Sequence, residues 1–462
     1  MNRQRACLGW SEGKLPTRAL PVALILAALT DPAPAAEREL EDAPAPTSAR
    51  GIESPLERAF LRPARKEPLL PWVEEQLEEL PPFFADTEID ARFRTYYLRK
   101  DRTIDRLSEA WAMGGSISYR SGWLADFLSV EAEFFTSHPI VAPGARDGTQ
   151  LLAPGQESYS VVAVANAKLR YQGVVLTGYR QTLGLPYLNR SDSRMTPYTF
   201  EGLTLAKDEG TIQFSTGYLW KIKLRNSDEF ISMARKANPL LSKDRGLAYA
   251  GVLFRPNDDF HVGASAGVVP DLFAGIYSET SYARDLSAAV EMRFDAQVSY
   301  QQSVGSELLL VLPSFKTWNL GLRVSTSAAG AMFRLGFSIT GDERAILSPY
   351  GSNPSYVDLM QRTFTGADEK ALLLSFSYDF SQLGVSGLSV IVNFVEAWGG
   401  DVPGIRGDAR ELDATIDYRL PKELGIFEGL WLRMRGSWLD DETSDKNGSD
   451  FRVILRYDFP VV

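Results

Sequence analysis

The sequence predicts an all-β protein, a transmembrane antiparallel up-and-down β-barrel of about eighteen strands. Within Thr211–Arg225, one alternating set, from Ile212 to Leu224, is almost entirely apolar or aromatic and should face lipid, and the other is mostly polar. A period of two indicates a β-strand with two unlike faces, and this one exceeds the usual five or six residues of soluble strands. Similar segments recur to the end of the chain, and no run of eighteen apolar residues indicates a membrane-spanning helix.

The N-terminus has the order of charged, apolar and small residues that is typical of a secretory signal peptide. Four cations precede the apolar run Ala19–Leu29, and Ala33-Pro34-Ala35 follows it. We therefore expect residues 1–35 to be removed on export. Residues 36–86 are rich in Pro, Ala and Glu, with a short helix predicted at Trp72–Leu80. This segment is interpreted as an acidic periplasmic extension, either a solvated tail or a plug, and residues 87–462 as the barrel.

The composition argues against several functional classes. The net charge of −10 makes the chain a poor nucleic-acid binder. The single cysteine, Cys7, lies in the predicted signal peptide, so neither disulfides nor cysteine metal sites are expected. The two histidines, His138 and His261, belong to no metal-ligand spacing and no serine–histidine–acid set. We expect no enzyme activity, no cofactor and no metal.

Period-two segments follow one another from residue 89 onward. The predicted strands are 89–98, 109–119, 124–136, 158–171, 174–183, 200–207, 211–225, 246–255, 260–269, 273–283, 286–300, 316–327, 331–340, 370–380, 387–398, 411–420, 429–439 and 450–459. Short turns alternate with long connections, except that the connection 270–272 is short where a long one belongs. Short periplasmic turns and long external loops are typical of outer-membrane barrels, and both termini would then lie in the periplasm.

The two faces of these strands differ in chemistry. Aromatic residues near strand ends, among them Trp220, Trp398 and Trp431, suit girdles at the two membrane interfaces. The polar faces are rich in cations, and charges in a lumen require water. The predicted channel-lining basic ladder is Arg92, Arg94, Lys168, Arg170, Arg419, Arg433, Arg435, Arg452 and Arg456.

Two interpretations of these cations remain open. A column of cations attracts anions and passes them from site to site, whereas cross-strand salt bridges would only stabilise the wall. For a single arginine the salt bridge is favoured. For Arg433, Arg435, Arg452 and Arg456 the ladder is favoured, because they lie on adjacent strands with matching parity and few acids oppose them. Lys221, Lys223 and Arg225 lie at the external end of their strand and are interpreted as an entrance patch for anions.

Several segments resemble the OprD family of outer-membrane porins. GLPYLNRSDSRMTPYTFEG at 184–202 is similar to the family's inward-folded third loop, and it lies between the fifth and sixth predicted strands. KALLLSFSYDFSQLGVSGLSVIVNF, ELDATIDYRL and GLWLRMRGSW continue the similarity, which runs from about Arg92 to the C-terminus. The extension at 36–86 and the end Phe459-Pro460-Val461-Val462 depart from the pattern, since a terminal aromatic is usual for barrel assembly.

The resemblance implies an eighteen-stranded barrel with an inward-folded third loop, as a monomer or homotrimer in the Gram-negative outer membrane. It implies passive diffusion of small carboxylate-bearing solutes past an arginine column that faces an electronegative constriction. The constriction-loop candidates are Tyr187, Asp192, Arg194 and Tyr198. Asp192 could equally be a turn residue, because Ser-Asp-Ser favours local backbone bonding. The expected partners are anionic organic solutes, outer-membrane lipid and the barrel-assembly machinery. The rival interpretation is a closed structural or adhesive barrel with a filled lumen.

Overall fold

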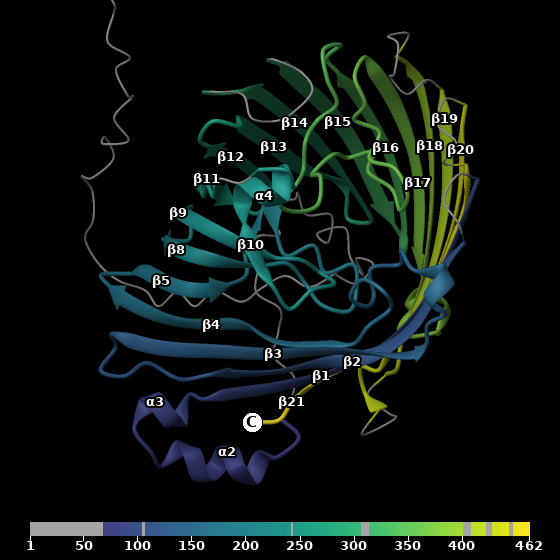
Figure 1. The fold of residues 1–462 in the computed structure, drawn as a ribbon. Helices are drawn as coiled ribbons and strands as arrows, with labels where there is room; N and C mark the ends of the chain where they lie inside the picture. Colours follow the sequence, from purple (N-terminus) through teal and green to yellow (C-terminus); the bar gives the residue numbers. More distant parts are fainter. Residues whose placement is uncertain are drawn as a thin grey trace, which may run out of the picture.

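Long antiparallel strands dominate the computed structural model, which describes residues 68–103, 107–241, 244–305, 314–400, 408–421, 427–442 and 447–462. The strands form a ring that surrounds shorter segments in its interior (Figure 1). None of the helices in these ranges is long and apolar enough to cross a membrane.

The sheet contains nineteen strands in the described residues, eighteen long ones and the short β10 (Phe230–Ser232). The long strands are β1 (Glu88–Arg102), β2 (Ser108–Arg120), β3 (Leu128–Val141), β4 (Tyr159–Tyr171), β5 (Val174–Gln181), β8 (Thr199–Asp208), β9 (Ile212–Lys223), β11 (Leu247–Asn257), β12 (Phe260–Val269), β13 (Phe273–Ser287), β14 (Val290–Ser303), β15 (Lys316–Ala328), β16 (Ala331–Thr340), β17 (Glu369–Asp379), β18 (Leu388–Gly399), β19 (Ala409–Arg419), β20 (Trp431–Asp441) and β21 (Gly448–Pro460).

Each long strand pairs antiparallel with the next along the chain, and β1 pairs with β21 to close the ring. The prediction of an antiparallel barrel of about eighteen strands is confirmed. The short connection at 270–272 is also real, since β12 ends at Val269 and β13 begins at Phe273. The turn predicted at Arg284-Asp285 is misplaced, because β13 continues to Ser287 and its partner starts at Val290.

The alternation of faces follows the sequence pattern. On β1, Phe93 is 38% exposed on the outer face, whereas Arg94, Tyr96 and Leu98 are buried on the inner face. Outward-facing apolar side chains such as Ile117 and Phe333 remain more than half exposed. An apolar outer surface on a closed antiparallel ring is what lipid requires, because every backbone group is then bonded within the sheet.

Strand β9 departs from strict alternation near its end. Leu219 pairs with Gly202 and Lys221 with Glu201, so Trp220 is an extra residue in a β-bulge. Beyond the bulge the faces exchange, and Ile222 is fully buried beside Phe200 rather than exposed to lipid. The expectation that every second residue from Ile212 to Leu224 faces lipid is therefore wrong after Trp220.

The shorter elements lie in the connections. The hairpin β6 (Gly184–Leu185) and β7 (Leu188–Asn189) belongs to the third loop, and α4 (Met233–Ala237) follows β10 in the fourth. The 3-10 helices η2 (Gly144–Arg146) and η3 (Phe380–Leu383) lie after β3 and β17. Met233 and Ala234 are fully buried in a cluster with Leu188 and Tyr350, so parts of three loops pack together inside the ring (Figure 1).

The N-terminal segment is fastened to the end of the barrel. Helices α2 (Pro71–Glu78) and α3 (Pro82–Ala85) lie near the C-terminus (Figure 1). The amides of Leu69 and Leu70 donate to the carbonyls of Pro460 and Val461 at 2.8 and 3.1 Å. The predicted short helix is present, but from residue 68 onward the extension is a bonded part of the structure rather than a solvated tail.

Candidate functional site: the lumen-facing loops and the arginine wall

The third loop crosses from β5 to the opposite parts of the ring. Its β6–β7 hairpin turns at Pro186 and Tyr187, where Tyr187 has a left-handed φ of 61°. The Tyr187 hydroxyl is hydrogen bonded to Ser299 Oγ on β14 at 2.6 Å. Its ring meets that of Tyr277 on β13 edge to face, with 6.0 Å between the centroids. Tyr187 therefore fastens one side of the loop to the β13–β14 wall.

Asp192 fastens the other side of the loop to the first strand. Its two carboxylate oxygens accept from the two terminal guanidinium nitrogens of Arg94, at 2.8 and 2.9 Å. Arg92 and Arg190 lie within 3.9 and 3.8 Å of the same carboxylate. Burial alone would raise the Asp192 pKa, but these cations, Arg94 first, hold it well below its usual value. The Asp192 carboxylate therefore bonds to the barrel wall through Arg94.

Arg194 joins the third loop to its surroundings, and Tyr198 packs into an apolar cluster. Arg194 donates to the carbonyls of Thr149 and Ser193 at 2.9 and 2.8 Å, and its own carbonyl accepts from Arg94. Burial and the nearby Arg452 lower the Arg194 pKa to about 9. Tyr198 is buried in the same apolar cluster as Leu188.

Strands β20 and β21 bring four predicted ladder residues together. Arg435 lies directly opposite Arg452 in the register, and Trp431 lies opposite Arg456. Three of the four arginines nevertheless pair with a carboxylate: Arg433 with Asp417 at 2.7 and 3.0 Å, Arg452 with Asp450 at 2.8 and 2.9 Å, and Arg456 with Asp458 at 2.5 Å. The expectation that few acids oppose this cluster is therefore wrong.

Arg435 lies opposite a threonine in the sheet. Its Nε donates to Thr415 Oγ1 on β19 at 3.2 Å, and the side chain is half-buried. Cross-strand placement explains this contact, since Asp417 lies opposite Arg433 and Thr415 opposite Arg435. Across this strand pair, Arg433 thus faces a carboxylate and Arg435 faces a hydroxyl.

Trp431 lies inside the wall and not in an interfacial girdle. It is 5% exposed, and its indole nitrogen donates to Asp417 at 2.9 Å. The guanidinium groups of Arg433 and Arg419 lie 4.3 and 5.0 Å from its ring. Arginine over an indole face is a favourable cation–π arrangement. The interpretation of Trp431 as a girdle residue is wrong, because its side chain belongs to the inner face of β20.

The remaining ladder candidates lie elsewhere on the wall. Arg92 pairs with Asp458 at 2.8 Å, and Lys168 pairs with Glu131 at 3.1 Å. Arg170 pairs with Asp126 and stacks over Trp123 at 4.1 Å. Lys168 and Arg170 are on β4, so the structure does not bring them to the cluster on β20 and β21.

The three entrance-patch candidates have different environments. Lys221 is exposed and lies 3.8 Å from Glu201. Lys223 is fully buried, and its ammonium donates to Thr196 Oγ1 and the Leu224 carbonyl at 3.0 and 2.7 Å. It therefore does not present its charge to solvent, because the following loop covers it. Arg225 donates to Ser193 Oγ at 2.5 Å and so lies at the third loop.

A small, partly open cavity of about 10 Å³ lies between the third loop and this wall. Of its ten lining residues, five are arginines and one is an aspartate, so its lining is strongly positive. The arginines are Arg94, Arg194, Arg433, Arg435 and Arg452. They come from the loop and from β1, β20 and β21, which are distant in sequence but adjacent around the seam of the ring.

A second inward loop, 341–368, brings carboxylates to the neighbouring strand β19. The amides of Met360 and Gln361 donate to Asp413 and Glu411 at 3.0 and 2.7 Å. Asp358 of this loop is also buried, and burial followed by repulsion from Asp413 raises its pKa to about 8. An acidic region therefore lies next to Arg435, whose charge acts in the opposite direction on the Asp358 pKa.

A family profile described as outer membrane porin, OprD family, matches residues 81–461. The chain belongs to the OprD family of outer membrane porins. Family membership and the barrel fold indicate that this porin is located in the outer membrane of a Gram-negative bacterium. No curated protein sequence matches it significantly.

Solved structures similar to the porin come from Pseudomonas aeruginosa. OccK9 (OpdG) is 22% identical with a TM-score of 0.75, over 82% of this chain and 100% of that one. OpdK with vanillate is 21% identical with a TM-score of 0.74, over the same shares. OccK2 (OpdF) in complex with glucuronate is 18% identical with a TM-score of 0.71, over 83% of this chain and 100% of that one. At these identities the likeness extends to the fold alone.

Sequence reasoning missed several residues of the porin's interior. Asp358, Glu411 and Asp413 come together only because loop 341–368 folds inward, whereas its length indicates an external loop. The same loop buries Arg362, whose guanidinium pairs with Glu369 and with Asp441 at 3.3 Å. A charge that is 2% exposed needs partners that the local sequence does not reveal.

Proposed function

We propose that this porin is a passive channel for small carboxylate-bearing solutes, such as amino acids, peptides and organic or aromatic acids. The observation that carries the proposal is the cavity between the third loop and the β20–β21 wall, in which five of ten lining residues are arginines. The solute would pass the predicted basic ladder, with Tyr187, Asp192, Arg194 and Tyr198 holding the loop that narrows the path. Lys221 and Arg225 would attract anions at the entrance.

Arginine suits this role because its planar guanidinium has five donors. Pairing with one carboxylate uses two of them, as in Arg433 with Asp417, and the planar fork matches the geometry of a passing carboxylate. A solute held by several such groups in turn exchanges from one to the next without a deep energy minimum. The chain's overall negative charge makes this local positive cavity the favoured path for an anion.

The named ligands of two relatives support the same chemistry. Vanillate accompanies OpdK and glucuronate accompanies OccK2 (OpdF), and both ligands carry a carboxylate. A channel of this kind performs no chemical step, so we propose that the porin is not an enzyme and needs no cofactor. Export by residues 1–35, a periplasmic extension at 36–86, insertion by the barrel-assembly machinery and a monomeric or trimeric state belong to the same proposal.

A closed structural barrel is the alternative function, and two observations favour it. The wall arginines Arg433, Arg452 and Arg456 are ion-paired, and parts of several loops fill the interior. Planar-bilayer recording and liposome swelling separate the two functions. The transport proposal requires conductance and faster swelling with carboxylate solutes than with cationic solutes of equal size, and a closed barrel gives neither.

Arg435→Gln is the sharpest variant for the test, because Arg435 lines the cavity and lies opposite Thr415 in the sheet. Loss of one charge about 4 Å from the solute changes its free energy by about 1 kcal/mol in water, or roughly fivefold in occupancy. We expect carboxylate flux to fall by about that factor. Arg410→Gln, on the exposed rim beside Glu396, is the matched control and leaves the flux unchanged. Equal flux in all three proteins would contradict the proposed mechanism.

A further inference from the structure

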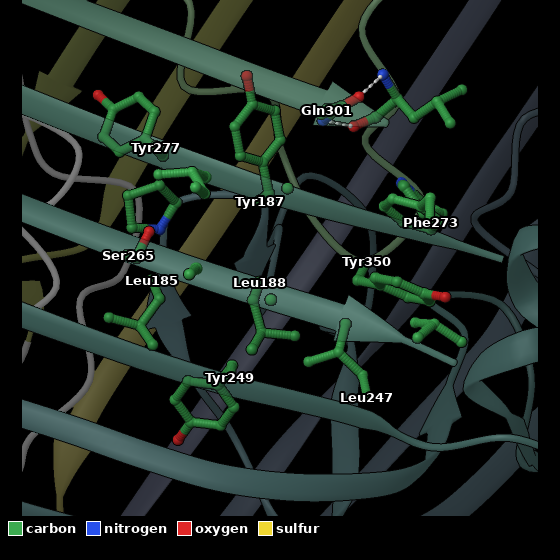
Figure 2. Close-up of a pocket in the computed structure, with 18 residues that line it drawn as sticks. Leu185, Tyr187, Leu188, Leu247, Tyr249, Ser265, Phe273, Tyr277, Gln301 and Tyr350 are labelled. Carbon is green, nitrogen blue, oxygen red and sulfur yellow. Dashed lines mark hydrogen bonds between the residues drawn. The ribbon is translucent and has the colours of Figure 1, made fainter. Parts of the chain in front are cut away.

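A second cavity lies on the other side of the third loop, away from the arginines. It is partly open to solvent, has a volume of about 60 Å³, and lies between the loop residues Leu185–Leu188, Tyr350 of loop 341–368, and strands β11 to β14. Figure 2 shows the side chains of Leu185, Tyr187, Leu188 and Tyr350 around it. Its roof is therefore the same hairpin that positions Asp192 a few residues later.

The floor of this cavity is hollow because it lacks side chains. Gly267 on β12 and Gly275 on β13 lie directly opposite each other in the register. A Cβ at Gly267 would have its nearest neighbour, the Ala248 carbonyl oxygen, at 3.7 Å, and one at Gly275 would contact Gln301 Cγ at 3.4 Å. Neither glycine has a positive φ. The backbone would thus accept a larger residue at either position, and strand propensity favours one. The space is empty because both positions are glycine.

Aromatic rings form two sides of the cavity. Tyr187 and Tyr277 meet edge to face, with an interplanar angle of 81°. Phe273 and Tyr350 are nearly parallel, at 10° and 6.2 Å between centroids. Rings in these orientations offer both faces and edges to a third ring, which aromatic contacts favour.

Three of the polar side chains around the cavity are already bonded to the protein. The hydroxyls of Tyr187 and Tyr350 are bonded to Ser299 Oγ and the Met233 carbonyl at 2.6 and 2.8 Å. The Gln301 amide exchanges two 2.8 Å hydrogen bonds with the backbone of Leu347. None of the eighteen described lining residues carries a charge. A charged ligand would lose its hydration here without compensation, whereas an apolar one would not.

We propose that this cavity is a binding site for a neutral molecule with a single aromatic ring, separate from the arginine-lined path. Apolar cavities in other proteins bind benzene, and this one adds aromatic walls. A bound ring would lie between the glycine floor and the Leu185–Leu188 hairpin, and so would brace the third loop against the β12–β13 wall. The site goes beyond the proposed transport function and exists whether or not carboxylates pass the arginines.

Bromobenzene soaked into crystals of the intact porin tests the site, because bromine is located directly by its anomalous scattering. We expect one peak between Tyr187, Tyr277 and Tyr350. Gly267→Val fills the floor and abolishes the peak, as does Ser265→Leu from the same strand. Ala264→Leu adds as many carbons as Gly267→Val on the outward face of β12, and it retains the peak.

Fluorobenzene binding in nanodiscs, followed by fluorine NMR saturation transfer, repeats the comparison in solution. Partition into lipid is the same for all variants, so the difference between proteins reports the cavity. We expect affinity to fall by about tenfold or more in Gly267→Val, because the added carbons displace ring contacts, and to be unchanged in Ala264→Leu. No peak in the unaltered porin, a peak that persists in both filling variants, or density for a detergent chain in the cavity would each overturn the proposal.

Discussion

Asp192→Asn tests how the third loop is held against the wall. The substitution preserves size and removes the charge that accepts two hydrogen bonds from Arg94 at 2.8 and 2.9 Å. The Asp192 side chain is 3% exposed, and Arg92 and Arg190 lie within 4 Å of it. In the variant these cations face a neutral amide in a buried site. We therefore expect the loop to leave the wall more often.

The size of the effect follows from the burial of the pair. Removal of one partner from a buried ion pair costs about 3–5 kcal/mol. If the cost falls on the loop and not on the barrel, the ratio of attached to detached loop decreases by about a hundredfold or more. The barrel strands themselves keep their ladder bonds, so unfolding of the whole protein should change little.

The pH dependence of the unaltered porin provides an independent check. The pKa of Asp192 is held well below its usual value of about 3.9 in the folded protein. A depressed pKa contributes stability that is present above the usual value and is lost only as the pH falls through the lower, folded value. The loop of the unaltered porin should therefore stay attached from pH 7 down to pH 4, with no change from this group.

Single-channel recording and hydrogen exchange of residues 184–198 measure the attachment. Asp192→Asn should give noisier current and faster exchange in this loop. The double variant Arg94→Gln with Asp192→Asn should show a smaller effect than the sum of the two single effects, because the two residues are paired. Asp258→Asn, in the exposed turn before β12, is the control. If Asp192→Asn matched the unaltered porin in both noise and exchange, the proposed role of this ion pair would be refuted.

Three further changes test other contacts. Burial and Asp413 raise the Asp358 pKa to about 8, so the packing of loop 341–368 loses stability as the pH rises from about 4 to about 8. Asp358→Asn should abolish this pH dependence, as measured by hydrogen exchange at 355–362. Gly122→Ala places a Cβ 2.0 Å from the Pro82 carbonyl oxygen, which should displace α3 and increase proteolysis near it while heat unfolding of the barrel stays the same. Tyr187→Phe removes the hydrogen bond to Ser299 and should loosen the hairpin by about 1 kcal/mol, seen as roughly fivefold faster exchange of its amides.

The strands could be predicted from the sequence because their signal is local. In β21, Phe451, Val453 and Leu455 alternate with Arg452 and Arg456, and a period of two needs no knowledge of the rest of the chain. The closure of the sheet follows from the same pattern, since lipid on the outer face leaves no room for an open edge.

Contacts across the lumen could not be predicted, because they depend on residues far apart in sequence. The acids that pair with Arg433 and Arg456 are evident in the sequence. Which arginine each acid pairs with depends on the cross-strand register and on side-chain direction. The bulge at Trp220 reverses which residues of β9 point outward and which point inward. No proline or glycine stands at that position to indicate a bulge in the sequence. The inward path of loop 341–368 rests on contacts such as Met360 with Asp413, which no local pattern encodes.

The seam between β1 and β21 has a consequence for how the barrel is completed. It joins residues as far apart as Arg92 and Asp458, so the ring cannot close until the last strand has been exported. Leu69 and Leu70 then add hydrogen bonds to the carbonyls of Pro460 and Val461, and Val462 is 4% exposed. The last residues are thus covered by the segment at Leu69 and Leu70. A purification tag attached after Val462 would have to leave through this closed seam, whereas one placed in an exposed turn, such as that at Asp258, would leave the seam intact.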